Sequence, residues 1–250
     1  LKPFVLFCHT RRSFQILPVG ISNWRNSSLF RKQMVEKKKT QKTIGGRMIT
    51  LPLSYFGPIE EFVYLAKNDE LVYESKEHFV KQSYRNRCII YGANGLLRLT
   101  VPLVLKSREK TAMENVKISY AENWQAHHWK SIQSAYKNSP FFDHYQELIL
   151  PLFFEEFDTL QNLNLKALQI VKECLQMNCK TKLSEAFEPY TEKDLRLLIH
   201  PKKEPTLELP RYIQVFEEKH GFHKNLSILD LIFNEGPSAL LYLQNVQLAR

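Results

Sequence analysis

Short apolar runs separated by turn residues open the chain's regular pattern and predict strands in its first half. Residues 48–53 read as a short buried strand and residues 70–74 as a second strand. Between them, Ile59 to Lys67 carries apolar residues at helical spacing, with acidic residues in the first turn where the helix dipole favours them. The pattern therefore predicts strand, loop, helix, strand.

A hairpin is predicted next, because Asn94-Gly95 separates two runs rich in β-forming residues, 85–91 and 96–104. Asn-Gly between such runs is a strong signal for a two-residue hairpin turn. Pro102 either places the second run at a sheet edge or marks where its pairing ends, because proline has no N–H to donate. Residues 116–120 alternate in polarity and predict one more short strand.

From residue 122 the apolar spacing becomes helical. Helices are expected over 122–137, over 141–157 with a kink or break at Pro151, and over 163–177. The later signals are an N-cap at Thr191, a short helix over 211–219 ended by His220-Gly221, a helix over 228–233 capped by Ser227, and a last helix opened by Pro237.

These elements place the chain in the α/β or α+β class. A strand-rich N-terminal half, containing the strand-loop-helix-strand opening and the Asn-Gly hairpin, is expected to pack against a helical C-terminal half. Residues 48–250 are expected to form a single domain.

The net charge of +9 changes this picture only at the N-terminus. Residues 1–47 hold 11 Lys and Arg and one acidic residue, whereas the remaining 203 residues carry a net charge of −1. The leader has no hydrophobic period, so it is expected to be disordered, or to be upstream sequence translated ahead of a true start at Met48. An export signal and a basic nucleic-acid arm are weaker alternatives, and nucleic acid is an unlikely partner for the near-neutral remainder.

Several classes of function are disfavoured by composition and motif content. No apolar run approaches 18 residues, so no transmembrane helix is expected. Four cysteines without paired spacing indicate reduced thiols and a cytoplasmic protein rather than a disulfide framework or a metal clip. The sequence lacks nucleotide-binding glycine motifs and serine-hydrolase motifs, and no cofactor or metal is expected.

Candidate chemistry lies in separated segments that mix aromatic, cationic and amide side chains. Such mixtures are typical of pocket linings rather than of a core or a solvated face. The segments are 78–87, 124–130, 136–142 and 221–237.

The first segment predicts an anion site. Arg85 and Arg87 have the same parity on an expected strand, so both would project from one face, and a carboxylate or phosphate would satisfy both. Lys81 lies four residues before Arg85 and supports this interpretation, with Tyr84 and Asn86 as further substrate-binding candidates. The alternative is a pair of surface arginines that bind acidic residues of the same chain.

The later segments supply catalytic candidates, His127, His128 and Glu235. His128 shares an apolar helix face with Trp124, which is more typical of a hydrogen-bonded core histidine, while His127 is freer for acid–base work. Spacing does not separate the two histidines, and Glu235 is either an acid or base or a helix-end carboxylate.

Amide and phenol groups of the later segments are the remaining substrate-binding candidates. They are Tyr136, Asn138 and Asn234, with helix capping as the alternative role for the amides. All the candidates from both halves are expected to converge in a single cleft.

Several of these motifs, in this order, resemble the WbqC-like family of bacterial proteins over about residues 48–245. They are Lys81-x-x-Tyr84-Arg85-Asn86-Arg87, the Trp124 to Ile132 helix, Ala135 to Phe142, and Asn225 to Pro237. Glu60-Glu61 stands where members of the family often have Gly-Tyr, and the preceding turn lacks their Gln, which implies a different substrate if that turn touches it.

The resemblance implies a role in surface-polysaccharide (O-antigen) biosynthesis, with transfer of glycine onto a sugar as the suggested reaction. The expected function is a cytoplasmic transferase acting on an anionic small molecule, with a sugar nucleotide as a candidate substrate. The alternative is a non-catalytic binding or scaffold protein in a bacterial assembly.

Overall fold

The structure is a computed structural model that describes residues 49–105, 110–187, 194–197 and 199–248. The expectations for residues 1–47 and for the N-cap at Thr191 fall outside these ranges. The opening is confirmed: β1 (Thr50–Pro52), α2 (Ile59–Lys67) and β2 (Glu70–Glu74) follow one another as predicted.

The main sheet is parallel and contains one strand that the sequence pattern did not predict. Its order is β1-β2-β7, with β7 (Lys180–Leu183) pairing β2 in register Leu71 with Thr181. Two lysines interrupt the apolar character of β7, which is why periodicity missed it. Asp194 forms a parallel bridge with Thr50 on the other side of β1, so the carboxyl ends of all these strands meet at one edge.

The hairpin is confirmed, but it begins later than predicted. β3 (Arg87–Gly92) pairs antiparallel with β4 (Gly95–Thr100), and Tyr84–Asn86 forms a 3-10 turn, η2, ahead of it. The expectation that Arg85 and Arg87 project from one face of a strand is therefore wrong. Past Pro102 the pairing changes partner, because β5 (Leu103–Val104) pairs with β6 (Lys117–Ile118).

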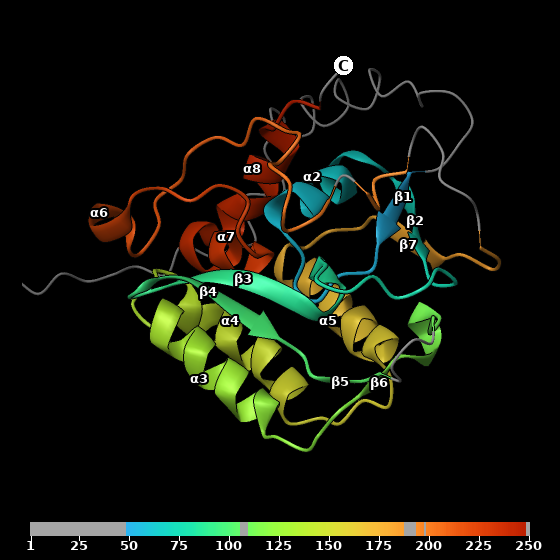
Figure 1. Cartoon of the computed structure of the whole chain (residues 1–250). Helices are drawn as coiled ribbons and strands as arrows, with labels where there is room; N and C mark the ends of the chain where they lie inside the picture. The colour runs from blue at the N-terminus through green and yellow to red at the C-terminus, as the bar shows by residue number, and fades with distance from the viewer. Residues whose placement is uncertain (1–48, 106–109, 188–193, 198, 249–250) are drawn as a thin grey trace, which may run out of the picture. The chain divides into compact units, whose positions relative to one another are not determined.

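Helices form most of the second half, as expected. They include α3 (Trp124–Tyr136), α4 (Phe142–Ile149) and α5 (Leu160–Cys174), with short 3-10 turns η3 (Met113–Asn115) and η4 (Leu150–Phe153). Pro151 lies in η4, so the predicted break in the 141–157 helix is confirmed. Strand β3 lies against α3 on one side and α7 (Ile228–Glu235) on the other (Figure 1).

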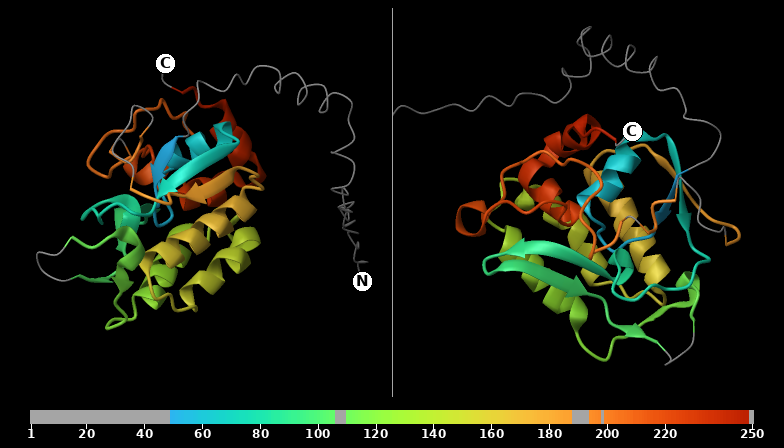
Figure 2. Two further views of the ribbon diagram at one scale, coloured as in Figure 1. Left: turned by 90° about the vertical axis from the view of Figure 1, so that its right-hand side faces the viewer. Right: turned by 45° about the horizontal axis from the view of Figure 1, so that its top comes forward.

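The helix predicted over 211–219 is wrong in its first part, since only α6 (Glu217–His220) is helical. Residues 211–214 alternate between exposed and buried, with Tyr212 and Gln214 facing inward, so an extended segment forms there instead. After α7 come η5 (Gly236–Ser238) and α8 (Ala239–Asn245), and α8 packs against α2 (Figure 2).

Capping side chains connect segments that are distant in sequence. Ser227 caps α7 as predicted, through its hydroxyl and the Leu229 N–H. Pro58 at the start of α2 offers no side-chain cap, and the Asn225 carboxamide accepts the Glu60 N–H from 165 residues away. The fold is mixed α/β, with small sheets mainly in the N-terminal half and helices in the C-terminal half.

Candidate functional site

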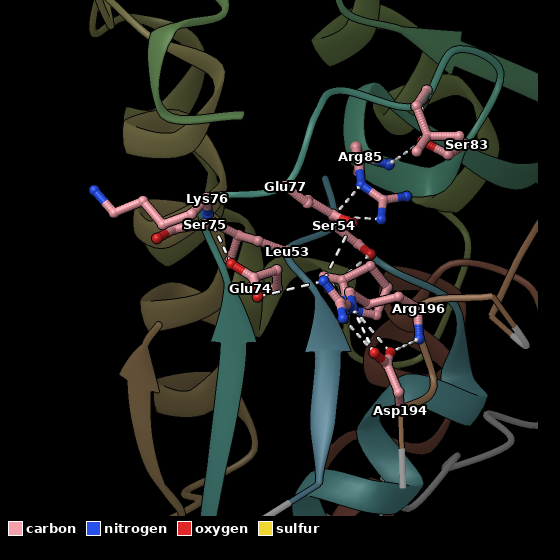
Figure 3. A network of polar contacts seen from close by, with 12 residues as sticks. Leu53, Ser54, Glu74, Ser75, Lys76, Glu77, Ser83, Arg85, Asp194 and Arg196 are labelled. Atoms are coloured by element: carbon pink, nitrogen blue, oxygen red, sulfur yellow. Dashed lines mark hydrogen bonds and ion pairs between the residues drawn. The ribbon is translucent and has the colours of Figure 1, made fainter. Parts of the chain in front are cut away.

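A buried charge network lies at the carboxyl edge of the parallel sheet (Figure 3). The Arg85 Nε donates to Glu77 Oε1 at 2.7 Å, and Arg196 Nη1 lies 3.3 Å from Glu74 Oε2. Arg196 also binds Asp194 through its Nε at 2.8 Å. Glu74 ends β2 and Glu77 follows it, Asp194 and Arg196 lie at and just after the bridge to β1, and Arg85 comes from η2.

The charges in this network largely satisfy one another. None of the five side chains is more than 8% exposed. Burial raises the pKa of Glu77, while the positive charges of Arg85 and Arg196 oppose that rise. A buried charge needs a partner to be tolerated, and here each partner comes from the chain itself. The network therefore holds the sheet edge together and leaves Arg85 committed to Glu77 rather than to a ligand.

Glu61 extends the polar region into the first turn of α2. Tyr73 donates its hydroxyl to Glu61 Oε1 at 3.3 Å. Glu61 Oε2 lies so close to Gly57 that a side chain at position 57 would overlap this oxygen. Burial raises the pKa of Glu61 from 4.5 to about 8, so its carboxyl is mostly protonated at neutral pH. Contacts with Ser54, Tyr73 and Arg85 act in the opposite direction.

An open hollow of about 320 Å³ lies beside η2, and Asn86 of η2 forms part of its lining. Its polar wall consists of Lys81, Gln82, Asn86 and Arg87. Its other wall runs along the segment from Thr100 to Leu105, with Phe79 completing the lining.

The cations of this hollow differ from those of the buried network because they are not paired. Within the described ranges, no ion pair joins Lys81 or Arg87 to a carboxylate, and the buried Nε of Arg87 has no hydrogen-bond partner. Burial lowers the pKa of Arg87, and the charge of Arg98 adds to that effect. An arginine in this situation is satisfied by an anionic ligand.

Asn86 fixes part of the wall of the same hollow. Its Nδ2 donates to the Val101 carbonyl at 3.0 Å, which sets the orientation of the carboxamide. Its Oδ1 is enclosed by the protein and has no partner among the described residues, and the whole side chain is only 7% exposed. Asn86 therefore holds the η2 end of the wall against the segment that begins at Thr100.

The loop that contains His200, Lys202 and Lys203 adds positive charge near Arg87. Burial lowers the pKa of His200, and the charges of Lys202, Arg85, Lys203 and Arg87 act in the same direction. His200 Nδ1 accepts the Lys202 N–H at 3.2 Å. The region around Arg87 is therefore more basic than residues 78–87 alone suggest.

His128, one of the predicted catalytic groups, lies in the core. Its Nδ1 is 3.1 Å from the Tyr55 hydroxyl, and it also has a hydrogen bond with the backbone of Thr100. Burial lowers the pKa of His128 from 6.5 to about 4, and the Thr100 contact partly offsets this. The ring is neutral at physiological pH and is packed against Trp124. His127 is exposed on the outer face of α3.

Two of the predicted groups meet at a different buried carboxylate, Asp230 of α7. Asn234 Nδ2 donates to the Asp230 carbonyl at 2.8 Å, and the Tyr136 hydroxyl interacts electrostatically with the Asp230 carboxylate. Tyr212 and Gln214 of the extended segment also bind this carboxylate, Tyr212 at 2.6 Å. Burial raises the pKa of Asp230 from 3.8 to about 6, which these four hydrogen-bonding neighbours counteract.

The contacts thus divide the predicted residues into groups. Lys81, Asn86 and Arg87 line the hollow; Tyr84, which is buried in η2, and Arg85 adjoin it. Asn138 is exposed and Glu235 half-buried at the end of α7. The patterns did not single out several buried polar or titratable residues around the site: Glu61, Glu77, Asn164, Arg196, His200 and Asp230.

A metal site requires several ligand side chains that converge, and a membrane-spanning helix requires a long apolar sequence. No three or more His, Cys, Asp or Glu side chains in the described ranges are arranged to hold a metal ion. No helix in the same ranges combines the length and the apolar character needed to cross a membrane.

Comparison with known proteins places the hollow and the buried network in one matched region. A model of the WbqC-like protein family matches residues 54–204, more than half of the chain. Uncharacterized protein Rv1507c of Mycobacterium tuberculosis is 25% identical over 213 residues, which cover 73% of this chain and 91% of that protein. No solved structure matches the chain. The chain belongs to the WbqC-like protein family.

Proposed function

We propose that this WbqC-like protein is a cytoplasmic transferase that binds an anionic small molecule in the hollow between Lys81, Asn86 and Arg87. The observation that carries the proposal is that two cations, Lys81 and Arg87, line an open hollow, and no ion pair in the described ranges joins either to a carboxylate. A phosphate or carboxylate would supply the missing acceptor for Arg87. Three buried free cysteines support the reducing compartment.

The reaction that the family resemblance implies is transfer of glycine onto a sugar for a surface polysaccharide. In that reaction a sugar hydroxyl oxygen bonds to the carbonyl carbon of an activated glycine, while the bond from that carbon to an anionic leaving group breaks. The hydroxyl proton passes to a base. In this proposal Lys81 and Arg87 hold the anionic group, and stabilising negative charge that develops on it would favour the transfer.

One observation favours a second candidate, a non-catalytic protein that binds the same anion. Among the described residues that line the hollow there is no His, Asp, Glu or Cys to act as a base or nucleophile. His128, one of the predicted bases, is committed to Tyr55 and Thr100. Both candidates predict anion binding, and only the transferase forms a product that mass spectrometry would detect when acceptor and donor are mixed with the protein.

Anion binding is tested with Arg87→Gln, using the full chain and a panel of phosphates, sulfate and carboxylates. Hydrogen bonds to charged groups contribute about 1.5–3 kcal/mol, so the variant should bind the best anion roughly ten- to a hundredfold more weakly. Lys137→Gln is the matched control, because Lys137 is exposed at the end of α3, does not line the hollow, and its variant loses the same charge. No binding by wild type, or equal losses in both variants, would refute the anion site.

A further inference from the structure

The lining of the hollow changes in chemical character along the segments that form it. At one end Arg87 pairs with Thr100 in the hairpin, and Asn86 binds the Val101 carbonyl. The lining then follows the chain to Leu105, a distance of up to roughly 16 Å for five extended residues. At about 320 Å³ the hollow reaches the size range of small-molecule sites, so it has room for more than a bare anion.

The far end is apolar. Leu103, in β5, and Leu105 line it, and both side chains are partly buried and pack against the core. Phe79 also lines the hollow, and its backbone N–H donates to the Thr111 carbonyl at 2.9 Å, in the segment that leads to β6. An aromatic ring and two aliphatic side chains form a surface suited to a flat apolar group.

The turn that presents Lys81 and Gln82 is fixed by its own backbone. Ser83 donates its hydroxyl to the Val80 carbonyl at 2.6 Å and accepts the Arg85 N–H. Gln82 adopts φ of 59°, a left-handed conformation that is uncommon for a residue other than glycine. Such a conformation persists where the surrounding structure imposes it, and here it sets the polar wall of the hollow.

We propose that the ligand of this hollow is a nucleoside phosphate, with its phosphate between Lys81 and Arg87 and its base against Phe79, Leu103 and Leu105. The inference rests on the proposed anion site and adds the class of ligand. Two features of the lining lead to it: the cations Lys81 and Arg87 call for negative charge, and Phe79 with the two leucines calls for a flat apolar group. A sugar phosphate and an alkyl phosphate lack the flat group, and a nucleoside phosphate has both.

Isothermal titration of the full chain tests the inference with uridine and adenosine monophosphates, ribose 5-phosphate and an alkyl phosphate. Stacking of one base on an aromatic side chain corresponds to roughly five- to 150-fold in affinity, so at least one nucleotide should exceed ribose 5-phosphate by such a factor. In Phe79→Ala that ratio should fall toward one, while ribose 5-phosphate keeps its affinity within about twofold. If the alanine variant does not fold, Phe79→Leu replaces it in the same titrations, because leucine keeps the apolar contact with the core but has no ring. The same fall in the affinity ratio is expected.

Phe154→Ala is the matched control, since Phe154 is 77% exposed and does not line the hollow, and it should leave every affinity unchanged. Ribose 5-phosphate or the alkyl phosphate binding as tightly as the nucleotides would overturn the nucleoside inference and leave the anion site intact. Phe79 variants that keep the wild-type ratio would overturn it in the same way. Absence of binding by all four phosphates would remove the anion site itself, and with it the proposed function.

Discussion

Ionisation of Glu61 should make the protein less stable as the pH rises. Its pKa is raised by burial from 4.5 to about 8, so the folded state holds a proton that the unfolded state has already released. The stabilising contribution is complete below about pH 4.5 and is lost as the pH rises through about 8. Glu61→Gln keeps the shape and the hydrogen bond from Tyr73 but removes the titration.

The size of the effect follows from the same values. Each pKa unit corresponds to about 1.4 kcal/mol, so full ionisation of Glu61 would cost about 5 kcal/mol of folding free energy. Between about pH 5 and about pH 9, the free energy of unfolding of wild type minus that of Glu61→Gln should fall by about 4 kcal/mol. Other groups, such as Asp230, titrate alike in both proteins and cancel in this difference.

Urea unfolding followed by tryptophan fluorescence, at several pH values in this range, measures the difference directly. Glu70→Gln is the control, because Glu70 lies partly exposed beside Lys182 on the surface of the sheet and its variant should follow the wild-type pH profile closely. A Glu61→Gln difference that stays constant within about 1 kcal/mol from about pH 5 to about pH 9 would refute the reasoning.

Two further changes test the packing around the site. Gly236 has φ of 52° and a side chain there would overlap the Phe141 ring, so Gly236→Ala should cost about 2–4 kcal/mol and lower the Tm by roughly 5–15 °C. A Tm within about 2 °C of wild type, or no partial recovery on adding Phe141→Ala, would contradict this. Arg85→Met leaves the Glu77 carboxylate short of its main partner and should cost about 3–5 kcal/mol in urea unfolding, part of which Glu77→Gln restores. A loss below about 1 kcal/mol would show that Arg196 alone satisfies Glu77.

Local patterns predicted most of the elements because each depends on neighbouring residues. The bounds of α2 and β2 follow from apolar spacing and turn residues, and the hairpin from Asn94-Gly95. Where the pattern failed, the contact that decided the structure was distant. Residues 211–214 carry enough apolar character for a helix, yet Tyr212 and Gln214 bind Asp230 and hold them extended.

The candidate site was likewise predictable in its location along the chain but not in its internal contacts. The run from Lys81 to Arg87 marked a cationic site, and four of its members line the hollow. Its internal geometry was not predictable, because η2 turns Arg85 toward Glu77 and leaves Arg87 facing the hollow.

By itself, then, the sequence determined the class of fold, most elements and the segment in which cations gather, since these depend on side chains a few residues apart. Only the tertiary structure decided which cations are paired and which are free. Asn164 binds the carbonyls of Leu53 and Arg85, from 111 and 79 residues away, and Arg196 reaches Glu74 across the parallel sheet. A charge or hydrogen bond is satisfied by whatever lies within about 3–4 Å in space, and position along the chain does not record that distance.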